Sequence, residues 1–543
     1  MASSKPFPSK QKPFTLLLLL LCLTLTLLIQ YNTTYNLHLD DDPPATLLPY
    51  AATGPPRWYD KLQYMIQNHS NNKLKIGLVN LDVDQIQVNG LADVTTINFK
   101  SVINNDGGEN KKWEDFFPEW VDEDGKWGTM KCPEIPLPES YEKVDVVVAR
   151  VPGGGQRRDL FRLQVNLVVA NVLVNSGWGV DGDHEEVYVV FIGDLSGGPM
   201  WEIFRCDDMI WEEKDYRIYK PDLGKLKQKV NMPVGSCMIS PSHQFDGGST
   251  YKSREAYVTV LHSSEKYVCG AIALAQSIRQ TNSSKDLILL ADHSISPKSL
   301  RGLESAGWKI KLIQRIRSPH AKKGAYNEYN YSKLRIWQLT QYDKVIFIDA
   351  DLIVLKNLDE LFGYPQLSAV GNNKYLFNSG LIIIEPSKCM FNSLMKNIFT
   401  FGSYNGGDQG FLNEAFTWWH RLHSRVNRLK VFLDQKRNYR REIRDDLYTL
   451  HFLGLKPWVC YKDYDCNWDK PDCRHFASDS AHRKWWEVYE AMPGKLKGFC
   501  GLTKKLDARI QKWRGVARRG GFRDGHWKMK VKDRRRATLD MMV

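Results

Sequence analysis

The sequence predicts an α/β protein. Its main domain is expected to be a doubly wound, mostly parallel β-sheet, preceded by a smaller α/β region and an N-terminal membrane helix. Three observations support this: strand-like apolar runs alternate with helical patterns in the second half of the chain, similar runs occur nearer the N-terminus, and an uncharged apolar stretch opens the sequence. Such alternation is typical of parallel sheets with helices on both faces. The 543 residues allow about two to four domains.

The clearest alternation follows a loop at residues 245–250. Short apolar runs there have the length of buried strands, and the stretches between them place apolar residues at helical spacing. Strands connected by helices in this order favour a single, largely parallel sheet. The predicted strands span 256–262, 286–292 and 308–313, the predicted helices span 267–280, 297–307 and 330–342, and the strand-like stretch KVIFIDADLIVL comes next.

A smaller α/β region is predicted at residues 73–245. Its runs KIGLVNLD, VDVVVARV and VYVVFIGD read as buried strands, and residues 161–177 show a helical pattern that ends at Gly177. VPGGG at 151–155 is interpreted as a turn, because it lacks the spacing of a phosphate-binding loop. No motif assigns a function to this region, and support of the main sheet, polysaccharide binding and dimerisation are all compatible with it.

The chain opens with an apolar run, Phe14–Ile29, that contains no charge. Lysines precede the run and no Lys or Arg follows it until Arg57, which predicts a cytoplasmic N-terminus and a lumenal body. A cleaved signal peptide is the alternative, but the polar QYNTTYN follows instead of small residues. The predicted parts are a cytoplasmic tail at 1–13, a signal-anchor helix at 14–30 and a stem at 31–72.

A lumenal body permits glycans and disulfides. Of the ten cysteines, Cys22 lies in the apolar run, which leaves nine, so at least one is expected to be unpaired or intermolecular. Disulfides in a C-terminal subdomain are favoured over a zinc site, because the spacing is not that of paired CxxC motifs. The cysteines of this cluster are Cys460, Cys466, Cys473 and Cys500, and the glycosylation sequons are at Asn32, Asn68, Asn282 and Asn330.

The net charge of +13 is concentrated in residues 501–543. A lumenal location argues against a nucleic-acid partner. We interpret this segment as a solvated, basic C-terminal tail. Contact with an anionic polysaccharide or lipid, or docking of a partner, are the alternatives.

Two carboxylates close a buried strand in the main domain. Val345–Ile348 are apolar, and Asp349 and Asp351 follow. Residues i and i+2 of an extended chain point the same way, so both carboxylates can face one ion at the sheet edge where open α/β sheets bind ligands. Hard divalent ions prefer oxygen ligands and bridge diphosphates. A pair of exposed loop acids is the alternative.

Three further motifs raise the specificity of this signal. FNSG at 377–380 precedes an apolar run, and NGGDQGFLNEAF at 405–416 combines glycines with a carboxylate and a carboxamide. HFLGLKPW supplies His451, Gly454 and Lys456 within six residues. An imidazole can complete a metal site, a lysine can reach phosphate, and glycine permits close backbone approach.

Taken in order, these motifs resemble glycosyltransferase family 8, the glycogenin-like group with a GT-A fold. The resemblance covers residues 255–458 and implies a GT-A domain at 251–500. The stretch LGLKPWVCYKDYDCNW, together with the long region before Tyr251, resembles more narrowly the plant glucuronosyltransferases that decorate xylan. The blocks that carry the resemblance are AYVTVLHSSEKYVCGAIALAQSI, SKLRIWQLTQYDKVIFIDADLIVLKNLDELF, FNSGLIIIEP, GGDQGFLNEAF and HFLGLKPW.

The resemblance implies the site residues. Asp349, Asp351 and His451 match the metal ligands, with Mn²⁺ expected and Mg²⁺ as the alternative. Lys333, Asp408 and Gln409 match catalytic positions, and Lys333 also helps to hold the donor. The positions expected around the uridine, the diphosphate and the transferred sugar are Leu261, His262, Tyr267, Lys333, Asp349, Ala350, Asp351, Asn378, Ser379, Gly380, Asn405, Asp408, Gln409, His451, Gly454 and Lys456.

Two departures from glycogenin affect this set. Asn405 stands where glycogenin has an aspartate, which fits a different donor sugar or acceptor. One residue, instead of two, separates Gly454 from Lys456, as in the plant group. Arg335 and Lys374 are candidates to read a donor carboxylate, since a uronate should be bound by a cation.

The resemblance implies a retaining glycosyltransferase that moves glucuronic acid from UDP-glucuronate to xylan. A front-side route or a covalent route through Asp408 would retain the anomeric configuration. Golgi membrane insertion as a single-pass type II protein is expected, with a homodimer or a complex with other Golgi transferases as possible assemblies. Alternatives are a glycogenin-like glucosyltransferase, a sphingolipid glucuronosyltransferase and an inactive lumenal scaffold that binds a partner transferase.

Overall fold

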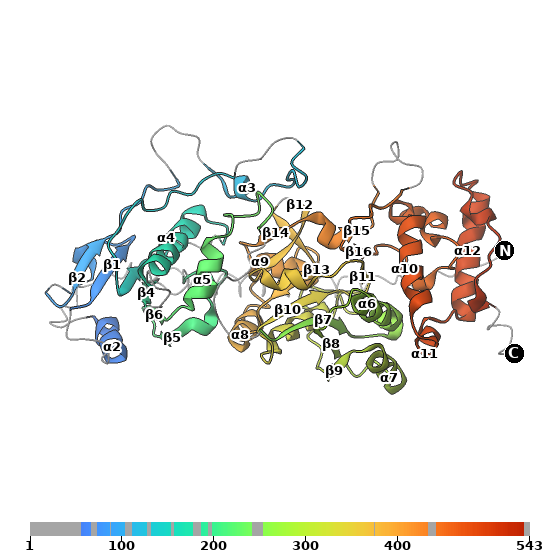
Figure 1. Cartoon of the computed structure of the whole chain (residues 1–543), viewed down its shortest axis with the longest axis horizontal. Coiled ribbons are helices and arrows are strands. Elements are labelled where there is room, and N and C mark those ends of the chain that lie inside the picture. The colour runs from blue at the N-terminus through green and yellow to red at the C-terminus, as the bar shows by residue number, and fades with distance from the viewer. Residues whose placement is uncertain are drawn as a thin grey trace, which may run out of the picture. The chain divides into compact units, whose positions relative to one another are not determined.

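The computed structural model (Figure 1) describes residues 56–536 with internal gaps. The predicted cytoplasmic tail, membrane helix and most of the stem lie outside the described residues. No helix in the described part of the chain is long and apolar enough to cross a bilayer. Trp58–Val543 belong to one compact unit. The residues not described are 1–55, 67–72, 87, 89, 104–110, 127–131, 154–156, 178–185, 194–197, 242–252, 374, 433–440 and 537–543.

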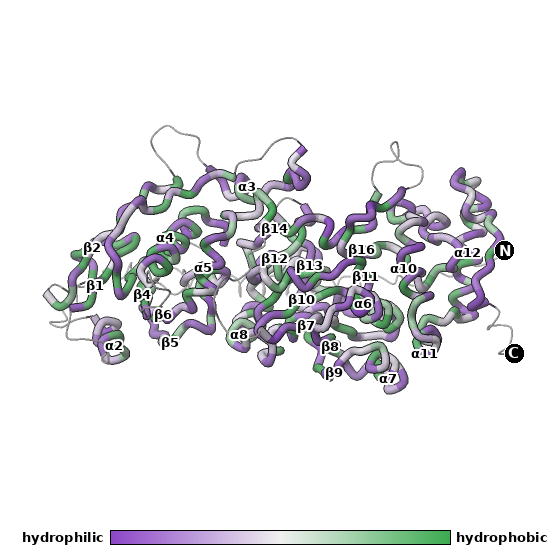
Figure 2. The backbone as a smooth tube through the Cα atoms, viewed as in Figure 1, coloured by the Kyte–Doolittle hydropathy of each residue, from purple (hydrophilic) through white to green (hydrophobic). Residues whose placement is uncertain are grey.

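The N-terminal region contains a six-stranded sheet in the order β2-β1-β3-β4-β6-β5. Its first four strands are parallel, and β6 and β5 extend it in antiparallel fashion. The three predicted runs form β1, β3 and β4, and the predicted helix forms α4, which is buried along most of its length and coloured mainly as hydrophobic in Figure 2. The strands are β1 (Lys75–Val79), β2 (Asp93–Thr96), β3 (Val146–Ala149), β4 (Tyr188–Ile192), β5 (Met209–Glu212) and β6 (Tyr216–Tyr219), and the helices are α3 (Trp113–Phe116), α4 (Leu160–Gly177) and α5 (Leu223–Val230).

Helix α2 (Arg57–Ile66) corrects the predicted stem. Trp58, Tyr59 and Leu62 are buried in one cluster with the strands of the N-terminal sheet. Their spacing of three and four residues puts the side chains on one helix face. The folded region therefore begins by residue 57, well inside the segment that the polar composition had suggested to be a stem.

The main domain is built on a seven-stranded sheet in the order β14-β12-β13-β10-β7-β8-β9. Strands β10, β7, β8 and β9 are parallel, whereas β13 runs antiparallel to both β10 and β12. The predicted doubly wound α/β sheet is confirmed, with a mixed strand direction on one side. The strands are β7 (Glu255–Leu261), β8 (Asp286–Ala291), β9 (Lys309–Leu312), β10 (Lys344–Ile348), β12 (Ser368–Asn373), β13 (Leu376–Ile384) and β14 (His420–Leu422), and the helices are α6 (Val268–Gln280), α7 (Pro297–Ala306), α8 (Lys388–Lys396) and α9 (Asp408–Ala415).

The apolar stretch at 344–355 forms two strands in different sheets. After β10 the chain turns, and β11 (Leu352–Val354) joins a three-stranded sheet in the order β11-β16-β15. Its partners are β16 (Thr449–His451) and β15 (Arg428–Leu429). The turn between the two sheets holds Asp349 and Asp351, so both carboxylates lie where the sheets meet.

Residues 330–342 were predicted as an α-helix, and this prediction was wrong in type. The segment forms 3₁₀ turns over Asn330–Gln338. Tyr331, Leu334 and Trp337 are fully buried, and their spacing of three residues suits a helix in which side chains at i and i+3 are aligned.

The two α/β regions share one hydrophobic core. Buried residues of α4 and α5 lie in the same cluster as residues of β10, β13 and α9. The predicted C-terminal disulfides are confirmed in part, because Cys473 is free and Cys500 pairs outside the cluster. The disulfides are Cys132–Cys237, Cys206–Cys389, Cys269–Cys500 and Cys460–Cys466.

The basic C-terminal segment is folded through residue 536, which corrects its interpretation as a solvated tail. Ile510 and Ala517 are buried, and their spacing of seven residues places them on one helix face. The buried Arg535 donates to the Trp458 carbonyl at 3.1 Å. The helices of this layer are α10 (Asp479–Ala491), α11 (Gly494–Lys497) and α12 (Lys504–Arg519).

Candidate metal and nucleotide-sugar site

Three potential metal ligands converge where the seven-stranded sheet meets the small sheet. One ligand atom each from Asp349, Asp351 and His451 lie within 4.8 Å of one another. Asp349 follows β10, and its N–H donates to the Gly380 carbonyl in β13 at 2.8 Å. Asp351 precedes β11, and the pairing of Leu352 with His451 brings the imidazole alongside. Strands of both sheets are needed to assemble this cluster.

Lysines balance the negative charge of the cluster. Lys456 Nζ lies 2.7 Å from Asp351 Oδ2, and Lys333 Nζ lies 3.4 Å from Asp349 Oδ1. Burial raises the pKa of Asp349. Burial acts the same way on Asp351, but Lys456 and His451 outweigh it and hold the Asp351 pKa below its usual range. Two carboxylates and one imidazole fit a divalent cation that accepts oxygen and nitrogen ligands.

Asn427 supports His451 from behind and was not singled out from the sequence. Its Oδ1 lies 3.2 Å from His451 Nδ1, and its Nδ2 donates to Asn378 Oδ1 at 2.8 Å. Because Oδ1 can only accept, the His451 proton sits on Nδ1 and Nε2 is left as a lone-pair donor. Nε2 lies 3.4 Å from Asp351 Oδ1, on the metal-binding side. A partner of this kind orients a metal-binding imidazole.

Lys333 and Asp408 form a buried ion pair beside the metal ligands. Lys333 Nζ contacts Asp408 Oδ2 and donates to the Ser379 carbonyl at 3.1 Å. The Ser379 hydroxyl donates to Asp408 at 2.8 Å. Burial alone would raise the pKa of Asp408, but Lys333 and the Ser379 hydroxyl outweigh burial and lower it. Asp408 is therefore an ionised carboxylate, and Lys333 connects it to Asp349.

The FNSG segment lies in β13, opposite the end of β10. Gly380 N–H donates to Asn378 Oδ1 at 2.9 Å, and Ser379 N–H donates to Gln409 Oε1 at 3.2 Å. A Cβ at position 380 would lie 2.5 Å from His451 Cε1, so the close approach of the imidazole requires glycine. Asn378 Nδ2 has no hydrogen-bond partner in the part of the chain that the structure describes, which leaves it available to a substrate hydroxyl.

The HFLGLKPW segment forms a tight turn after β16. Gly454 has a φ of +71°, and a Cβ there would lie 2.5 Å from Asn467 Oδ1. Asn467 fixes the turn, because it accepts from Leu455 N–H at 2.8 Å and donates to the Leu455 carbonyl at 2.9 Å. The turn holds Lys456 against Asp351, so a lysine ammonium lies next to the metal ligands, where it could bind a diphosphate.

The residues expected around the uridine border the same cluster. Leu261 ends β7 and is buried, and His262 Nδ1 lies 2.9 Å from Ser263 Oγ. Burial lowers the pKa of His262, which favours the neutral imidazole. Tyr267 precedes α6, and its ring meets Trp458 edge-on at 5.9 Å. Burial raises the pKa of Tyr267, and the nearby Lys456 ammonium opposes this rise.

Two of the predicted positions are held by hydrogen bonds outside the cluster, and a third lies outside the described residues. Asn405 Oδ1 accepts from the backbone N–H groups of Gly407 and Gly410 at 2.9 and 3.1 Å. Asn405 therefore organises the turn into α9 through its side-chain oxygen, and its expected part in substrate binding stays a prediction. The Arg335 guanidinium is held by a backbone carbonyl at 3.2 Å and by a glutamine side chain at 3.0 Å. Lys374 lies outside the described residues.

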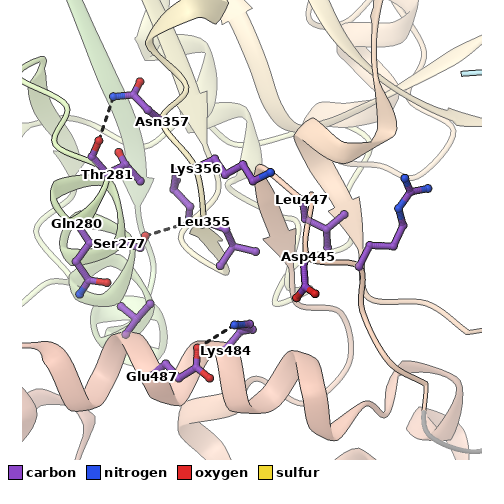
Figure 3. A pocket seen from close by; sticks show the side chains of 13 residues that line it. Ser277, Gln280, Thr281, Leu355, Lys356, Asn357, Asp445, Leu447, Lys484 and Glu487 are labelled. Carbon is purple, nitrogen blue, oxygen red and sulfur yellow. Dashed lines mark hydrogen bonds and ion pairs between the residues drawn. The ribbon is translucent and has the colours of Figure 1, made fainter. Parts of the chain in front are cut away.

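Helix α6 separates this site from a distinct pocket of about 440 Å³. At the start of α6, Gly270 packs so closely on Ala350 that a Cβ would lie 2.3 Å from the Ala350 carbonyl oxygen. Ser277 and Thr281, at the other end of α6, line the pocket, where Lys484 and Glu487 face each other (Figure 3). The pocket is therefore not part of the candidate site.

Two family models match this chain. Residues 49–237 match the GUX1-5 N-terminal domain, and residues 258–460 match glycosyl transferase family 8. Together they account for both α/β regions and for every metal-ligand candidate.

Several plant relatives match over most of their length. A protein of Arabidopsis thaliana, provisionally named UDP-glucuronate:xylan alpha-glucuronosyltransferase 4, is 55% identical over 457 residues, which cover 79% of this chain and 80% of that protein. UDP-glucuronate:xylan alpha-glucuronosyltransferase 2 of the same plant is 47% identical over 494 residues, with 86% and 81% covered. Glycogenin-1 of Mus musculus is 28% identical over 269 residues, with 46% and 80% covered.

The two family models match in the expected order, and the two plant relatives are 55% and 47% identical over about four fifths of their length. These matches identify the family. The protein is a glycosyltransferase that belongs to glycosyltransferase family 8, in the group of UDP-glucuronate:xylan alpha-glucuronosyltransferases.

Proposed function

We propose that this protein transfers glucuronic acid from UDP-glucuronate to backbone xylose of xylan, as an α-linked side group and with retention of the anomeric configuration. The observation that carries the proposal is the cluster of Asp349, Asp351 and His451 with Lys333 and Lys456 beside it. The names of the plant relatives supply the donor, the acceptor and the linkage. The cluster supplies the charges that a departing nucleoside diphosphate needs.

The residues divide the work of binding and charge stabilisation. Transfer breaks the bond between the sugar C1 and the diphosphate, forms a bond between C1 and the acceptor oxygen, and releases UDP and the acceptor proton. Lys456 and Lys333 place positive charge where the leaving diphosphate becomes more negative. Asp349, Asp351 and His451 would hold a divalent cation, which would supply Lewis-acid stabilisation of the same charge when bound. Asn378 Nδ2 is available to orient the sugar.

Asp408 can take part in either of two routes that retain the anomeric configuration of the donor sugar. As an ionised carboxylate it can attack C1 to form a covalent intermediate, which the acceptor then displaces. In a front-side route the acceptor attacks on the leaving-group face, and Asp408 only stabilises positive charge on the sugar. Mass spectrometry of protein quenched during turnover separates the two, because a covalent route leaves one glucuronosyl group on a peptide that contains Asp408.

Product analysis tests the proposal directly. The full-length chain, purified in detergent, is incubated with Mn²⁺, with each of several UDP-sugars, and with xylan oligosaccharides. We expect products that carry added glucuronosyl groups only from UDP-glucuronate. Transfer only from UDP-glucose, transfer only to a sphingolipid, or donor binding without any transfer would each contradict the proposal.

We further propose Mn²⁺ as the resident metal and a single-pass type II orientation in the Golgi membrane, with the catalytic domain in the lumen. The apolar run at 14–30 supports the orientation, and the four disulfides support an oxidising compartment. Chelation followed by addition of Mn²⁺, Mg²⁺ or Ca²⁺ tests the metal. Protease protection in sealed microsomes tests the orientation, since a cytoplasmic catalytic domain would be digested without detergent.

A further inference from the structure

Exposed tyrosines gather around the candidate site. The exposed tyrosines in the described part of the chain are Tyr64, Tyr267, Tyr326 and Tyr404. Tyr404 is hydrogen-bonded to Gln409, and Tyr326 lies near enough to Tyr267 for their phenol groups to interact electrostatically. Tyr326 is 87% exposed and Tyr404 is 57% exposed. Solvent-exposed aromatic rings at a binding site commonly bind an apolar surface of a ligand. The family resemblance places only Tyr267 at the nucleotide, so Tyr326 and Tyr404 have no assigned role.

Tyr404 is held directly beside the catalytic positions. Its hydroxyl accepts a hydrogen bond from Gln409 Nε2 at 2.5 Å. Gln409 also accepts from Ser379 N–H at 3.2 Å, and Ser379 contacts Asp408. The phenol is therefore anchored to the residues expected around the transferred sugar, while the ring remains open to solvent.

Tyr326 lies on a loop that is fastened to the loop of Tyr404. Asn327 Nδ2 donates to the Asn405 carbonyl at 2.8 Å, so the residues next to the two tyrosines are hydrogen-bonded to each other. Ser318 Oγ donates to the Gly406 carbonyl at 2.8 Å, which fastens the loops a second time. The approach is close, because a Cβ at Gly406 would lie 3.0 Å from Asn327 Nδ2.

The loop that carries Tyr326 is also closed on itself. Ser318 N–H donates to the Glu328 carbonyl at 2.7 Å, and Gly324 N–H donates to Glu328 Oε2 at 2.7 Å. Arg317 Nε pairs with Glu328 at 3.0 Å. Tyr326 itself makes no hydrogen bond within the described residues, so hydrogen bonds of the surrounding loop hold its exposed ring in place.

We infer that Tyr326 and Tyr404 form an aromatic platform that holds the acceptor polysaccharide against the donor site by stacking on its pyranose rings. This inference rests on the proposed function for the identity of the acceptor. A xylose ring has no exocyclic hydroxymethyl group, so its C–H face is flat and packs closely on an aromatic ring. Stacking of this kind is uncharged, which suits a neutral backbone, and two rings on fastened loops contact neighbouring sugars of one chain.

Steady-state kinetics of the full-length chain tests the platform. Acceptor KM is measured with xylan oligosaccharides at saturating UDP-glucuronate, and hydrolysis of UDP-glucuronate is measured without acceptor. Tyr326→Ala is expected to raise acceptor KM by about threefold to tenfold, with donor KM and acceptor-free hydrolysis unchanged. Tyr326→Trp, which keeps a ring, is expected to restore the wild-type value.

Tyr404 needs a variant that separates its ring from its hydroxyl. Tyr404→Phe keeps the ring and loses the bond to Gln409, whereas Tyr404→Ala loses both. The platform requires that acceptor KM rises in Tyr404→Ala and stays near wild type in Tyr404→Phe. Tyr64→Ala is the matched control, because Tyr64 is 73% exposed on α2, and it should change neither constant.

Unchanged acceptor KM in Tyr326→Ala and Tyr404→Ala would overturn the platform, and so would an equal rise in donor KM. These outcomes differ from failure of the proposed function, in which the wild-type chain itself transfers nothing to xylan. In that case saturation-transfer NMR with xylan oligosaccharides still decides the platform. Contact signals that disappear in Tyr326→Ala would support it, and absence of binding by the wild-type chain would overturn it.

Discussion

The parallel strands β2-β1-β3-β4 of the N-terminal region and β10-β7-β8-β9 of the main domain follow the same plan. In each set, the strand that comes first in the sequence lies between two later strands. The chain therefore continues to one side of this strand first and to the other side later, and the direction changes between β1 and β3 and between β7 and β10. A crevice forms at such a point, outside the carboxyl ends of the strands. The described residues contain a metal-ligand cluster at the second crevice, and none at the first.

The side chains that follow the strands explain the difference. After β1, Asn80 Nδ2 donates to the Arg150 carbonyl at 2.7 Å, so this side chain links the ends of β1 and β3 and offers no metal ligand. After β10, the chain enters a second sheet whose strand β16 delivers His451 opposite Leu352. Topology thus supplies a crevice, and the extra three-stranded sheet turns the crevice into a metal site.

The largest expected effect comes from removing one metal ligand. Asp351→Asn should lower transfer by at least about a hundredfold, because partners behind metal ligands alone account for tenfold to hundredfold effects. Metal affinity, measured by Mn²⁺ electron paramagnetic resonance, should fall in parallel. The matched variant at the first crevice, Asn80→Ala, should cost about 1 kcal/mol of stability and leave transfer unchanged. Equal losses of transfer activity in both variants would contradict the conclusion that only the second crevice holds the metal site.

Breaking the buried ion pair should have the next largest effect. Lys333→Met leaves Asp349 and Asp408 without their shared cation, at an expected cost of about 3–5 kcal/mol in the free energy of unfolding. The Asp408 pKa should then rise above its unfolded value, and the Asp349 pKa, which burial already raises, should rise further. The variant should therefore lose stability as pH rises and regain it as pH falls. Urea unfolding at pH 7 and pH 5 checks this, and a constant difference from wild type would contradict it.

Sequence reasoning found what local patterns encode. The strands appeared as apolar runs, and the metal ligands appeared as a motif at a strand end. The division of residues 344–355 into two strands was not visible, because Asp349 and Asp351 interrupt the apolar run without glycine or proline. Asn427 lies 24 residues before its partner and belongs to no motif, so only the folded chain reveals it. The high charge of the C-terminal segment made it look solvated, although α12 has buried apolar residues on one face.

Asn427 offers a smaller and more selective test of the metal crevice. Asn427→Leu removes the acceptor for His451 Nδ1 and the donor to Asn378, and it should weaken Mn²⁺ binding by about tenfold to hundredfold. Asn427→Asp still accepts from the imidazole and cannot donate, so its metal affinity should stay closer to wild type while donor KM rises. Identical affinities in the two variants would show that the carboxamide does not orient His451.

The smallest expected effect tests whether the N-terminal region acts as a support for the catalytic helix. Arg158 from this region pairs with Glu414 at 3.1 Å and donates to the Asn413 carbonyl at 3.1 Å, at the C-terminal end of α9. The other end of α9 carries Asp408. Cations at a helix C-terminus typically contribute about 0.3–1 kcal/mol, so Arg158→Ala should lower kcat by roughly twofold to fivefold, with little change in donor KM.

The control for this support is an arginine pair of the N-terminal sheet that does not reach α9. Arg217 pairs with Glu212 at 2.7 Å between β6 and β5, and Arg217→Ala should leave kcat unchanged. If Arg158→Ala and Arg217→Ala have the same kcat, the first sheet does not position the catalytic helix. If only Arg158→Ala lowers kcat, the sheet without a metal cluster contributes to catalysis through the far end of the helix that begins with Asp408.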